Sequence, residues 1–267
     1  MPTLQDPLTI VTDLDGSLLD HHTYSWQPAQ AWLDRLQDAR ITIVICSSKT
    51  ASEIIPLQRA LGLGSAPFIS ENGALIQWDG APDGPLRHHP GPDYASLCHT
   101  LLRIRQREGF KFTGFSDVTE KEIADWTGLS PGDAALAKMR EASESLIWRD
   151  DDARFALFRQ RLAEEGLALV QGGRFWHVMP QGWDKGSALR WLLQQTPFGA
   201  ASPVTIGLGD SPNDAPMLDS VDFAVMIKGF SKNPLLLQRA ATPAVYRTTH
   251  AGPQGWSEGL DYFITQT

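Results

Sequence analysis

The sequence is poor in cysteine, in long apolar runs and in blocks of basic residues. Its only two cysteines, Cys46 and Cys98, lack the spacing of metal ligands, so we expect two free thiols and no disulfide framework. No apolar stretch approaches the roughly 20 residues of a membrane span, and residues 1–13 lack the basic segment and apolar run of a signal peptide. We therefore expect a cytoplasmic protein without a membrane partner.

Positive charge is also scarce, because 23 Lys and Arg stand against 31 Asp and Glu, which gives a formal net charge of −8. This balance argues against a general nucleic-acid binder, but a small phosphorylated substrate needs only a few local cations or a metal. The composition is otherwise that of a globular protein, with 42% hydrophobic and 20% charged residues. We expect a small-molecule partner, no nucleic acid, and a monomer or weak dimer.

Short β-branched runs bounded by turn residues alternate with segments of helical periodicity, which predicts a parallel sheet with right-handed crossovers. The expected strands of this sheet are 8–13, 41–46, 203–210, 223–227 and 244–248. The expected helices are 25–39, 51–61, 184–195, 213–219 and 233–239. Pro56 lies within one of these helices and predicts a kink or a later start there.

The pattern changes in the middle of the chain. Residues 79–92 (DGAPDGPLRHHPGP) are rich in Gly and Pro and indicate a linker. Beyond them, helices and short strands mix as far as residue 181. We predict a doubly wound, Rossmann-like α/β core formed by residues 1–83 and 182–267, with an inserted α+β cap over residues 84–181.

Acidic side chains follow the expected strands at the edge where open α/β sheets bind ligands. Asp13 and Asp15 end the first strand, and side chains two apart in an extended chain point the same way. Taken alone, this stretch is also a common Asp-Gly turn. Other polar residues at strand ends or at the start of a helix are Ser47, Lys185, Asp210, Asn213 and Asp214.

Clustered carboxylates repel one another unless a cation neutralises them, and hard oxygen ligands suit Mg²⁺. A lysine and a hydroxyl beside them are groups that a phosphoryl oxygen would bind. The stretch DLDG does not fit a calcium-binding EF-hand loop, and no Gly-rich dinucleotide or P-loop fingerprint follows a strand. The residues therefore favour metal-assisted phosphate chemistry.

The motifs DLDGS, a strand ending in serine, a lone lysine and GDSPND, in this order, resemble the haloacid dehalogenase-like phosphatases. The resemblance implies that Asp13 is the nucleophile, Asp15 the general acid and base, and Lys185 a charge-neutralising residue. It implies phosphate binding by Ser47 and Asn213. The implied cofactor is Mg²⁺, held by Asp13, the backbone carbonyl of Asp15 and Asp210, with Asp214 completing or supporting the shell.

The strings ICSSKT, SENGALI, REASES, GGRFWHVM, GWDKGSA and GLGDSPNDAPML resemble the mannosyl-3-phosphoglycerate phosphatases, although Ser145 stands where a proline is expected. The implied substrate carries a phosphate, a carboxylate and a sugar. Candidate ligands are Arg140 and Arg174 for the carboxylate and Ser143, Glu144 and His177 for sugar hydroxyls. Lys49 reaches either substrate or solvent, Arg140 is equally a surface cation, and His177 equally a half-buried strand residue.

Three functions stay open from the sequence. The first is a Mg²⁺-dependent phosphatase that converts mannosyl-3-phosphoglycerate to mannosylglycerate. The second keeps the aspartyl phosphate but uses another sugar phosphate or glucosyl-3-phosphoglycerate, or transfers the phosphate as a phosphomannomutase does. The third is a phospho-acceptor signalling module, which needs neither Asp15 nor an inserted domain of this size.

Overall fold

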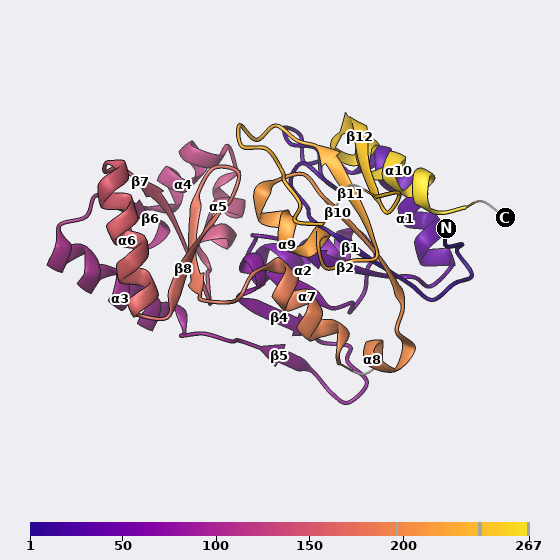
Figure 1. The fold of residues 1–267 in the computed structure, drawn as a ribbon, viewed down its shortest axis with the longest axis horizontal. Coiled ribbons are helices and arrows are strands. Elements are labelled where there is room, and N and C mark those ends of the chain that lie inside the picture. The colour runs from indigo at the N-terminus through magenta and orange to yellow at the C-terminus, as the bar shows by residue number, and fades with distance from the viewer. Residues whose placement is uncertain (196, 240–241, 266–267) are drawn as a thin grey trace.

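The computed structural model describes residues 1–195, 197–239 and 242–265 and contains two separate β-sheets (Figure 1). The larger has eight strands in the order β12-β11-β10-β1-β2-β3-β4-β5, parallel from β12 to β3 and antiparallel at β4 and β5. The smaller is antiparallel, in the order β6-β7-β9-β8. The predicted α/β class is confirmed. We call the larger sheet with its helices the main body, and the smaller sheet with its helices the cap.

The strands of the main body are β1 Leu8–Thr12, β2 Thr42–Cys46, β3 Phe68–Ser70, β4 Leu75–Trp78, β5 Leu86–His88, β10 Val204–Gly209, β11 Phe223–Lys228 and β12 Val245–Ala251. Its α-helices are α1 Gln30–Asp38, α2 Ala51–Ala60, α7 Lys185–Leu193, α8 Phe198–Ala201, α9 Ala215–Leu218 and α10 Gly252–Phe263. The cap contains α3 Tyr94–Glu108, β6 Phe112–Gly114, α4 Glu120–Thr127, α5 Pro131–Lys138, β7 Glu144–Trp148, α6 Asp152–Glu164, β8 Leu167–Gln171 and β9 Trp176–Pro180. None of the helices in the described ranges combines the length and apolarity needed to cross a membrane.

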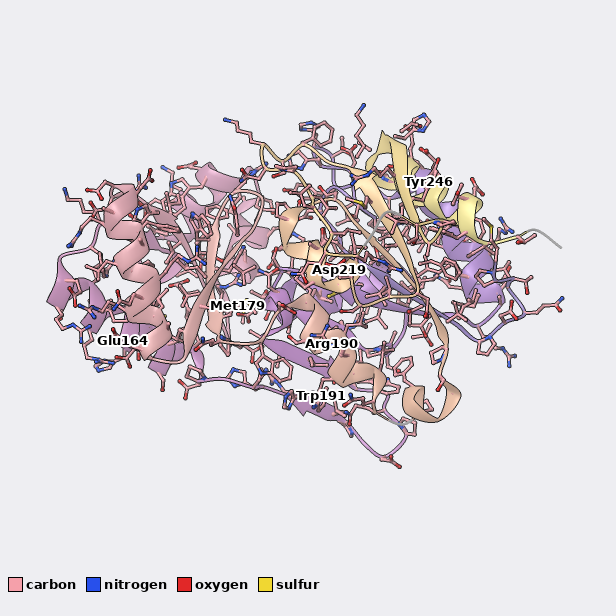
Figure 2. All side chains as sticks on the ribbon, viewed as in Figure 1. Glu164, Met179, Arg190, Trp191, Asp219 and Tyr246 are labelled. Atoms are coloured by element: carbon pink, nitrogen blue, oxygen red, sulfur yellow. The ribbon has the colours of Figure 1, made fainter. Side chains whose placement is uncertain are left out.

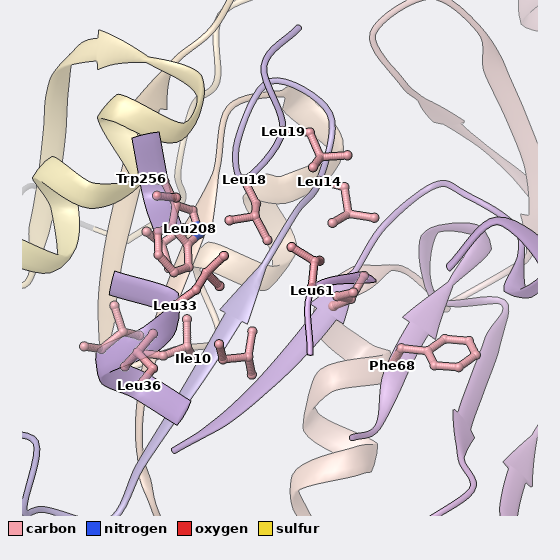
Figure 3. Close-up of a cluster of buried hydrophobic side chains, with 14 of the residues drawn as sticks. Ile10, Leu14, Leu18, Leu19, Leu33, Leu36, Leu61, Phe68, Leu208 and Trp256 are labelled. Atoms are coloured by element: carbon pink, nitrogen blue, oxygen red, sulfur yellow. The ribbon is translucent and has the colours of Figure 1, made fainter. Parts of the chain in front are cut away.

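The central strands are buried on both faces, as the unbroken apolar runs require. Along β1, Ile10 packs into one hydrophobic cluster and Val11 into another. The first cluster lies under α1, α2 and α10, where Leu33, Leu36 and Trp256 pack near Ile10 (Figure 3). The second lies under α7, α8 and α9. Helices on both faces leave the carboxyl ends of the parallel strands as the open edge.

The cap has its own hydrophobic cluster between α3, α6 and its sheet, and a second cluster around α4 and α5. Two of its residues, Ala142 and Met179, are instead part of the first cluster of the main body. Met179 lies where the two parts meet (Figure 2). Because apolar packing continues from one part into the other, the cap is seated on the main body.

Four local expectations need correction. The expected linker 79–92 contains β5, which pairs with β4 and extends the main sheet past residue 83. Residues 233–239 form an irregular segment with bends at its ends instead of a helix, and two of its backbone amides bond to Asp219. Helix α2 runs from Ala51 through Pro56 to Ala60, because its Thr50–Glu53 capping box fixes its start. Helix α10 was not expected, since Gly and Pro are frequent in it.

Gly259 gives a test of how closely α10 packs on the sheet. A Cβ built there would lie 2.3 Å from Cγ1 of Val225, a stiff and fully buried residue of β11. We expect Gly259→Ala to lower the free energy of unfolding by about 1–3 kcal/mol, although alanine favours a helix over glycine by about 1 kcal/mol. Urea unfolding of the two proteins measures the difference.

Gln254→Ala is the matched control, because Gln254 is exposed on the same helix. Its free energy of unfolding is expected to stay within about 0.5 kcal/mol of the parent. A Gly259→Ala protein as stable as the parent would show that the helix is not held against Val225.

Candidate functional site

Three strand ends meet at one edge of the main sheet. β1 pairs in parallel with β10 and with β2, so the residues that follow these strands are neighbours. The amide of Asp13 donates to the carbonyl of Leu208 at 2.9 Å, and the amide of Ser47 to that of Ile69 at 2.9 Å. The structure therefore brings together Asp13, Ser47 and Asp210, as the sequence predicts.

The turn after β1 is close to Asp210. Gly16 has a φ of 83°, and a Cβ there would lie 2.6 Å from Oδ2 of Asp210. The Ser17 hydroxyl donates to Oδ1 of Asp210 at 3.2 Å. Only glycine fits both the left-handed backbone and the approaching carboxylate. This explains why the DLDGS motif has glycine at this position.

The Lys185 ammonium lies between two carboxylates at the centre of the site. This side chain is fully buried, and its Nζ is 2.7 Å from Oδ1 of Asp13 and 2.6 Å from Oδ1 of Asp214. Lys185 is the first residue of α7, which the Asp184–Ser187 capping box begins. Although burial opposes its charge, the pKa of Lys185 is raised because the Asp13 and Asp214 carboxylates face it.

The acidic residues near Lys185 differ in their bonding. Oδ2 of Asp214 accepts hydrogen bonds from the amides of Asp210 and Ser211, both at 3.0 Å, so both of its oxygens are engaged. Asp13 bonds to Lys185 through Oδ1, and no partner of its Oδ2 is seen within the described residues. Asp13 thus has one oxygen to spare, and Asp210 accepts only hydroxyl groups, from Ser17 at Oδ1 and from Ser211 at Oδ2, both at 3.2 Å. Asp214 instead holds Lys185 and the backbone after β10.

Oxygens of Asp13, Asp210 and Asp214 lie within 4.8 Å of one another. Burial and then the charge of Asp214 raise the pKa of Asp13 to about 7, against the opposing effect of Lys185. Burial and the Asp13 charge also raise the pKa of Asp210 well above its usual value. One ammonium does not neutralise three buried carboxylates, so the site has excess negative charge.

Asp15 pairs with Lys49, a contact that the sequence left open. Nζ of Lys49 is 3.0 Å from Oδ2 of Asp15 and 3.5 Å from Oε1 of Glu53. Although burial opposes its charge, the pKa of Lys49 is raised by these two carboxylates. Oδ1 of Asp15 is buried and has no hydrogen-bond partner within the described residues. Asp15 therefore keeps one oxygen free beside Asp13.

A cavity of about 540 Å³ lies over these residues, between the main body and the cap. From the main body it is lined by predicted site residues and by neighbours that the sequence analysis did not single out. The predicted ones are Asp13, Asp15, Ser47, Lys49, Asp210 and Asn213, and the others include His21, Tyr24, Phe230 and Lys232. Such a volume is typical of a small-molecule site.

From the cap, the polar residues that line the cavity are Thr127, Arg140, Ser145, Arg174 and His177. Arg140 is buried, whereas Arg174 is exposed at the β8–β9 connection and donates to the carbonyl of Thr127 at 2.7 Å. Oγ of Ser145 is 3.0 Å from Nδ1 of His177. Burial and the nearby Arg140 charge lower the pKa of His177 to about 3, so its imidazole is neutral at pH 7 and suited to bind hydroxyls.

Two predicted substrate ligands do not line this cavity. Side chains alternate along β7, so Ser145 faces the cavity and Glu144 points the opposite way. Glu144 instead accepts hydrogen bonds from Tyr94 and from the Ser116 amide inside the cap. Ser143 donates its hydroxyl to Glu71 at 2.7 Å. The expected sugar contacts of Ser143 and Glu144 are therefore corrected.

Glu71 and Asn72 flank the site and were not singled out in the sequence. Nδ2 of Asn213 donates to Oδ1 of Asn72 at 2.9 Å, which ties the GDSPND segment to the end of β3. Asn213 lines the cavity through this arrangement. The Glu-Asn-Gly sequence carries a turn signal, but it does not reveal which side chains the turn presents to the site.

Comparison with known proteins gives two family matches. A model described as haloacid dehalogenase-like hydrolase matches residues 10–115, and one described as sucrose-6F-phosphate phosphohydrolase matches residues 149–264. The first covers the DLDGS motif and the second the segment from Lys185 to GDSPND.

Solved structures share the fold over nearly the whole chain. A haloalkanoate-superfamily phosphatase from Bacteroides thetaiotaomicron has a TM-score of 0.69 at 18% identity and covers 97% of this chain and 96% of its own. The sucrose-phosphatase from a Synechocystis species, solved with sucrose and phosphate, has a TM-score of 0.61 at 19% identity and covers 97% and 98%. A haloacid dehalogenase-like hydrolase from B. subtilis has 0.59 at 19% identity and covers 82% and 88%. The chain is therefore similar to haloacid dehalogenase-like hydrolases over residues 10–115 and to sucrose-6F-phosphate phosphohydrolases over residues 149–264, and it shares the fold of solved phosphatases of this superfamily.

Proposed function

We propose that the protein hydrolyses a phosphomonoester in two displacements at Asp13, under the cap. The observation that carries this proposal is the buried Lys185 ammonium between Asp13 and Asp214, which leaves one oxygen of Asp13 without a partner among the described residues, in a side chain that lines the cavity. A lysine in this position favours the ionised form of the nucleophile and stabilises the charge of a transferring phosphoryl group.

In the first displacement, an oxygen of Asp13 forms a bond to phosphorus and the bond to the leaving oxygen breaks. Asp15 gives its proton to that oxygen, and an aspartyl phosphate results. In the second, Asp15 takes a proton from water, the water oxygen attacks phosphorus, and the bond to Asp13 breaks. The net change consumes one water and releases an alcohol and inorganic phosphate. Ser47 and Asn213 are placed in the cavity to bind phosphoryl oxygens.

The residues of the site fit a Mg²⁺ ion. The donors are oxygens, and the pKa values of Asp13 and Asp210 are raised because both carboxyl groups are buried and other carboxylates face them. We propose Asp13, Asp210 and the Asp15 carbonyl as its ligands and Asp214 as the residue that supports them. Bound there, Mg²⁺ would neutralise these carboxylates and withdraw charge from the phosphoryl oxygens.

For the substrate we propose mannosyl-3-phosphoglycerate, converted to mannosylglycerate. Four cationic side chains line the cavity, namely Lys49, Arg140, Arg174 and Lys232. They favour a substrate with an anionic group besides its phosphate, as a glycerate carboxylate would supply. Neutral His177 with Ser145 suits sugar hydroxyls. A sugar phosphate without a carboxylate is the second candidate, because the sucrose-6F-phosphate phosphohydrolase model matches residues 149–264.

The nucleophile assignment predicts that Asp13→Asn loses turnover by a factor on the order of 10⁴ or more, because the amide cannot form the aspartyl phosphate. Phosphate release from a simple ester such as phenyl phosphate measures this. Asp38→Asn, an exposed residue of α1, is the control and keeps parental activity. Parental turnover in Asp13→Asn would exclude Asp13 as the nucleophile.

The metal assignment predicts a pH-dependent stabilisation by Mg²⁺. At a hundredfold excess over Kd, Mg²⁺ is expected to raise Tm by roughly 5 °C or more at pH 8. The increment is expected to shrink at pH 5.5, since the raised pKa of about 7 leaves Asp13 protonated there and the metal must displace that proton. Without metal, the same raised pKa adds stability as the pH falls from 8 toward 5.5, because the folded state then binds more protons than the unfolded chain. Thermal unfolding with and without Mg²⁺ at both pH values measures these changes.

Asp210→Asn is expected to abolish the Mg²⁺ increment, and Asp38→Asn to keep it. Equal increments at both pH values, or an increment that survives in Asp210→Asn, would argue against a metal at these carboxylates.

The substrate assignment predicts that mannosyl-3-phosphoglycerate has a higher kcat/KM than glucosyl-3-phosphoglycerate, sucrose 6-phosphate and mannose 6-phosphate. A second charged contact is expected to give an advantage of about tenfold to a hundredfold over the esters without a carboxylate. Phosphate release with Mg²⁺ present gives the ranking. A hundredfold preference for sucrose 6-phosphate would overturn the assignment and favour the second candidate.

A further inference from the structure

The turn after β3 has an unusual backbone. Glu71, Asn72 and Gly73 all have positive φ, at 50°, 60° and 103°. A left-handed conformation is unfavourable for Glu, so surrounding bonds must hold it. The amide of Glu71 donates to the carbonyl of Lys49 at 2.9 Å, and that of Asn72 to the carbonyl of Ser47 at 3.0 Å. The turn is therefore fixed to the loop that carries two cavity residues.

This backbone sends the Glu71 side chain into the cap, where it is fully buried. Oε1 accepts from the amide of Glu141 at 2.8 Å. Oε2 accepts from the amide and hydroxyl of Ser143, at 2.8 and 2.7 Å, and from the amide of Ala142 at 3.2 Å. One carboxylate of the main body thus binds three successive amides of the cap.

Arg140 directly precedes these three amides in the chain and is held by Glu71 and Ser143. Its Nη2 is 3.6 Å from Oε2 of Glu71 and donates to Oγ of Ser143 at 2.8 Å, while its Nε donates to the carbonyl of Ser143 at 3.0 Å. Nη2 also lies 3.4 Å from the carbonyl of Ser48. The Arg140 side chain lines the cavity, and no partner of its Nη1 is seen in the described part of the chain. Two nitrogens of the guanidinium are fixed, and the third is available to a ligand.

We propose that Glu71 is a positioning residue for anion recognition. It holds Arg140 and the 141–143 backbone on the main body, so that Nη1 of Arg140 is preorganised for the anionic group of the substrate that is not the reacting phosphate. This inference rests on the proposed function, since it requires a substrate with two anionic groups. A buried ion pair is a weak source of stability, whereas fixing a guanidinium before binding saves the entropy of ordering it.

The position of the turn gives this arrangement a consequence for the cap. Asn72 bonds to Asn213, and a Cβ on Gly73 would lie 2.3 Å from the carbonyl of Asp184, next to Lys185. The turn that binds the cap therefore also contacts the segments that carry the phosphate site. The contacts that place Arg140 are thus the same contacts that seat this part of the cap on the main body.

The test compares Glu71→Gln with Glu141→Gln. Glu141 is the neighbouring carboxylate, and its side chain is 38% exposed and pairs with Arg87 at the surface. Turnover of phenyl phosphate, which has no second anionic group, is inhibited in parallel by 3-phosphoglycerate, which has two anionic groups, and by inorganic phosphate, which has one. In Glu71→Gln, Ki for 3-phosphoglycerate is expected to rise about tenfold to a hundredfold. Ki for inorganic phosphate and kcat for phenyl phosphate stay within about twofold, and Glu141→Gln changes none of the three.

Arg140→Lys keeps the charge but not the fork of donors, and it is expected to raise Ki for 3-phosphoglycerate by a similar factor. The double variant with Glu71→Gln is then expected to have a Ki for 3-phosphoglycerate close to that of either single variant, because both changes disrupt the same Glu71–Arg140 contact.

An equal rise in Ki for both inhibitors in Glu71→Gln would show a merely structural role and overturn the proposal, as would an unchanged Ki for 3-phosphoglycerate. If the wild-type protein does not bind 3-phosphoglycerate more tightly than inorganic phosphate, the second-anion site is excluded. If 3-phosphoglycerate inhibits in a Glu71-dependent way but mannosyl-3-phosphoglycerate is not hydrolysed, only the proposed substrate fails.

Discussion

The site depends on one buried ammonium shared by two carboxylates. Lys185 comes from the start of α7, Asp13 from the end of β1 and Asp214 from the segment after β10, so three distant parts of the chain meet at one Nζ atom. Removing these charges from water is unfavourable, and hydrophobic residues of similar size would pack at lower cost. The arrangement has a chemical use, because the ammonium favours the ionised form of a desolvated carboxylate beside the cavity, and attack on phosphorus requires that form.

Much of the site at the strand ends of the main sheet could be predicted from the sequence, because open α/β sheets bind ligands at the carboxyl ends of their parallel strands. Once 8–13, 41–46 and 203–210 are taken as parallel neighbours, the residues after them must lie at one edge. Asp13, Ser47 and Asp210 follow without any knowledge of side-chain contacts. The sequence predicts Lys185 at the start of a helix, but it does not predict that this side chain is fully buried, since a lysine at the start of a helix is ordinarily exposed to water.

The cap was less predictable, for reasons that particular residues show. Ser143, Glu144 and Ser145 are consecutive, and a strand sends neighbouring side chains to opposite faces. Which face meets the cavity depends on the pairing of β7 with β9, a register that spans more than thirty residues of sequence. Glu71 was missed for a similar reason, because its partners at 140–143 lie some seventy residues away. Pairs this distant leave no periodic signal in a single sequence.

The two halves of the site therefore have different tasks. In the main body, most polar groups at the strand ends already bind one another: Lys185 with Asp13 and Asp214, Lys49 with Asp15, and Asn213 with Asn72. These contacts suit the transfer of a phosphoryl group and leave few donors to distinguish one alcohol from another. The cap adds further polar groups to the cavity wall, at Arg140, Arg174, Ser145 and His177. Chemistry and selectivity thus reside in different layers, and the strained turn at Glu71 joins them, since it contacts the phosphate site through its backbone and Asn72 and the cap through its carboxylate.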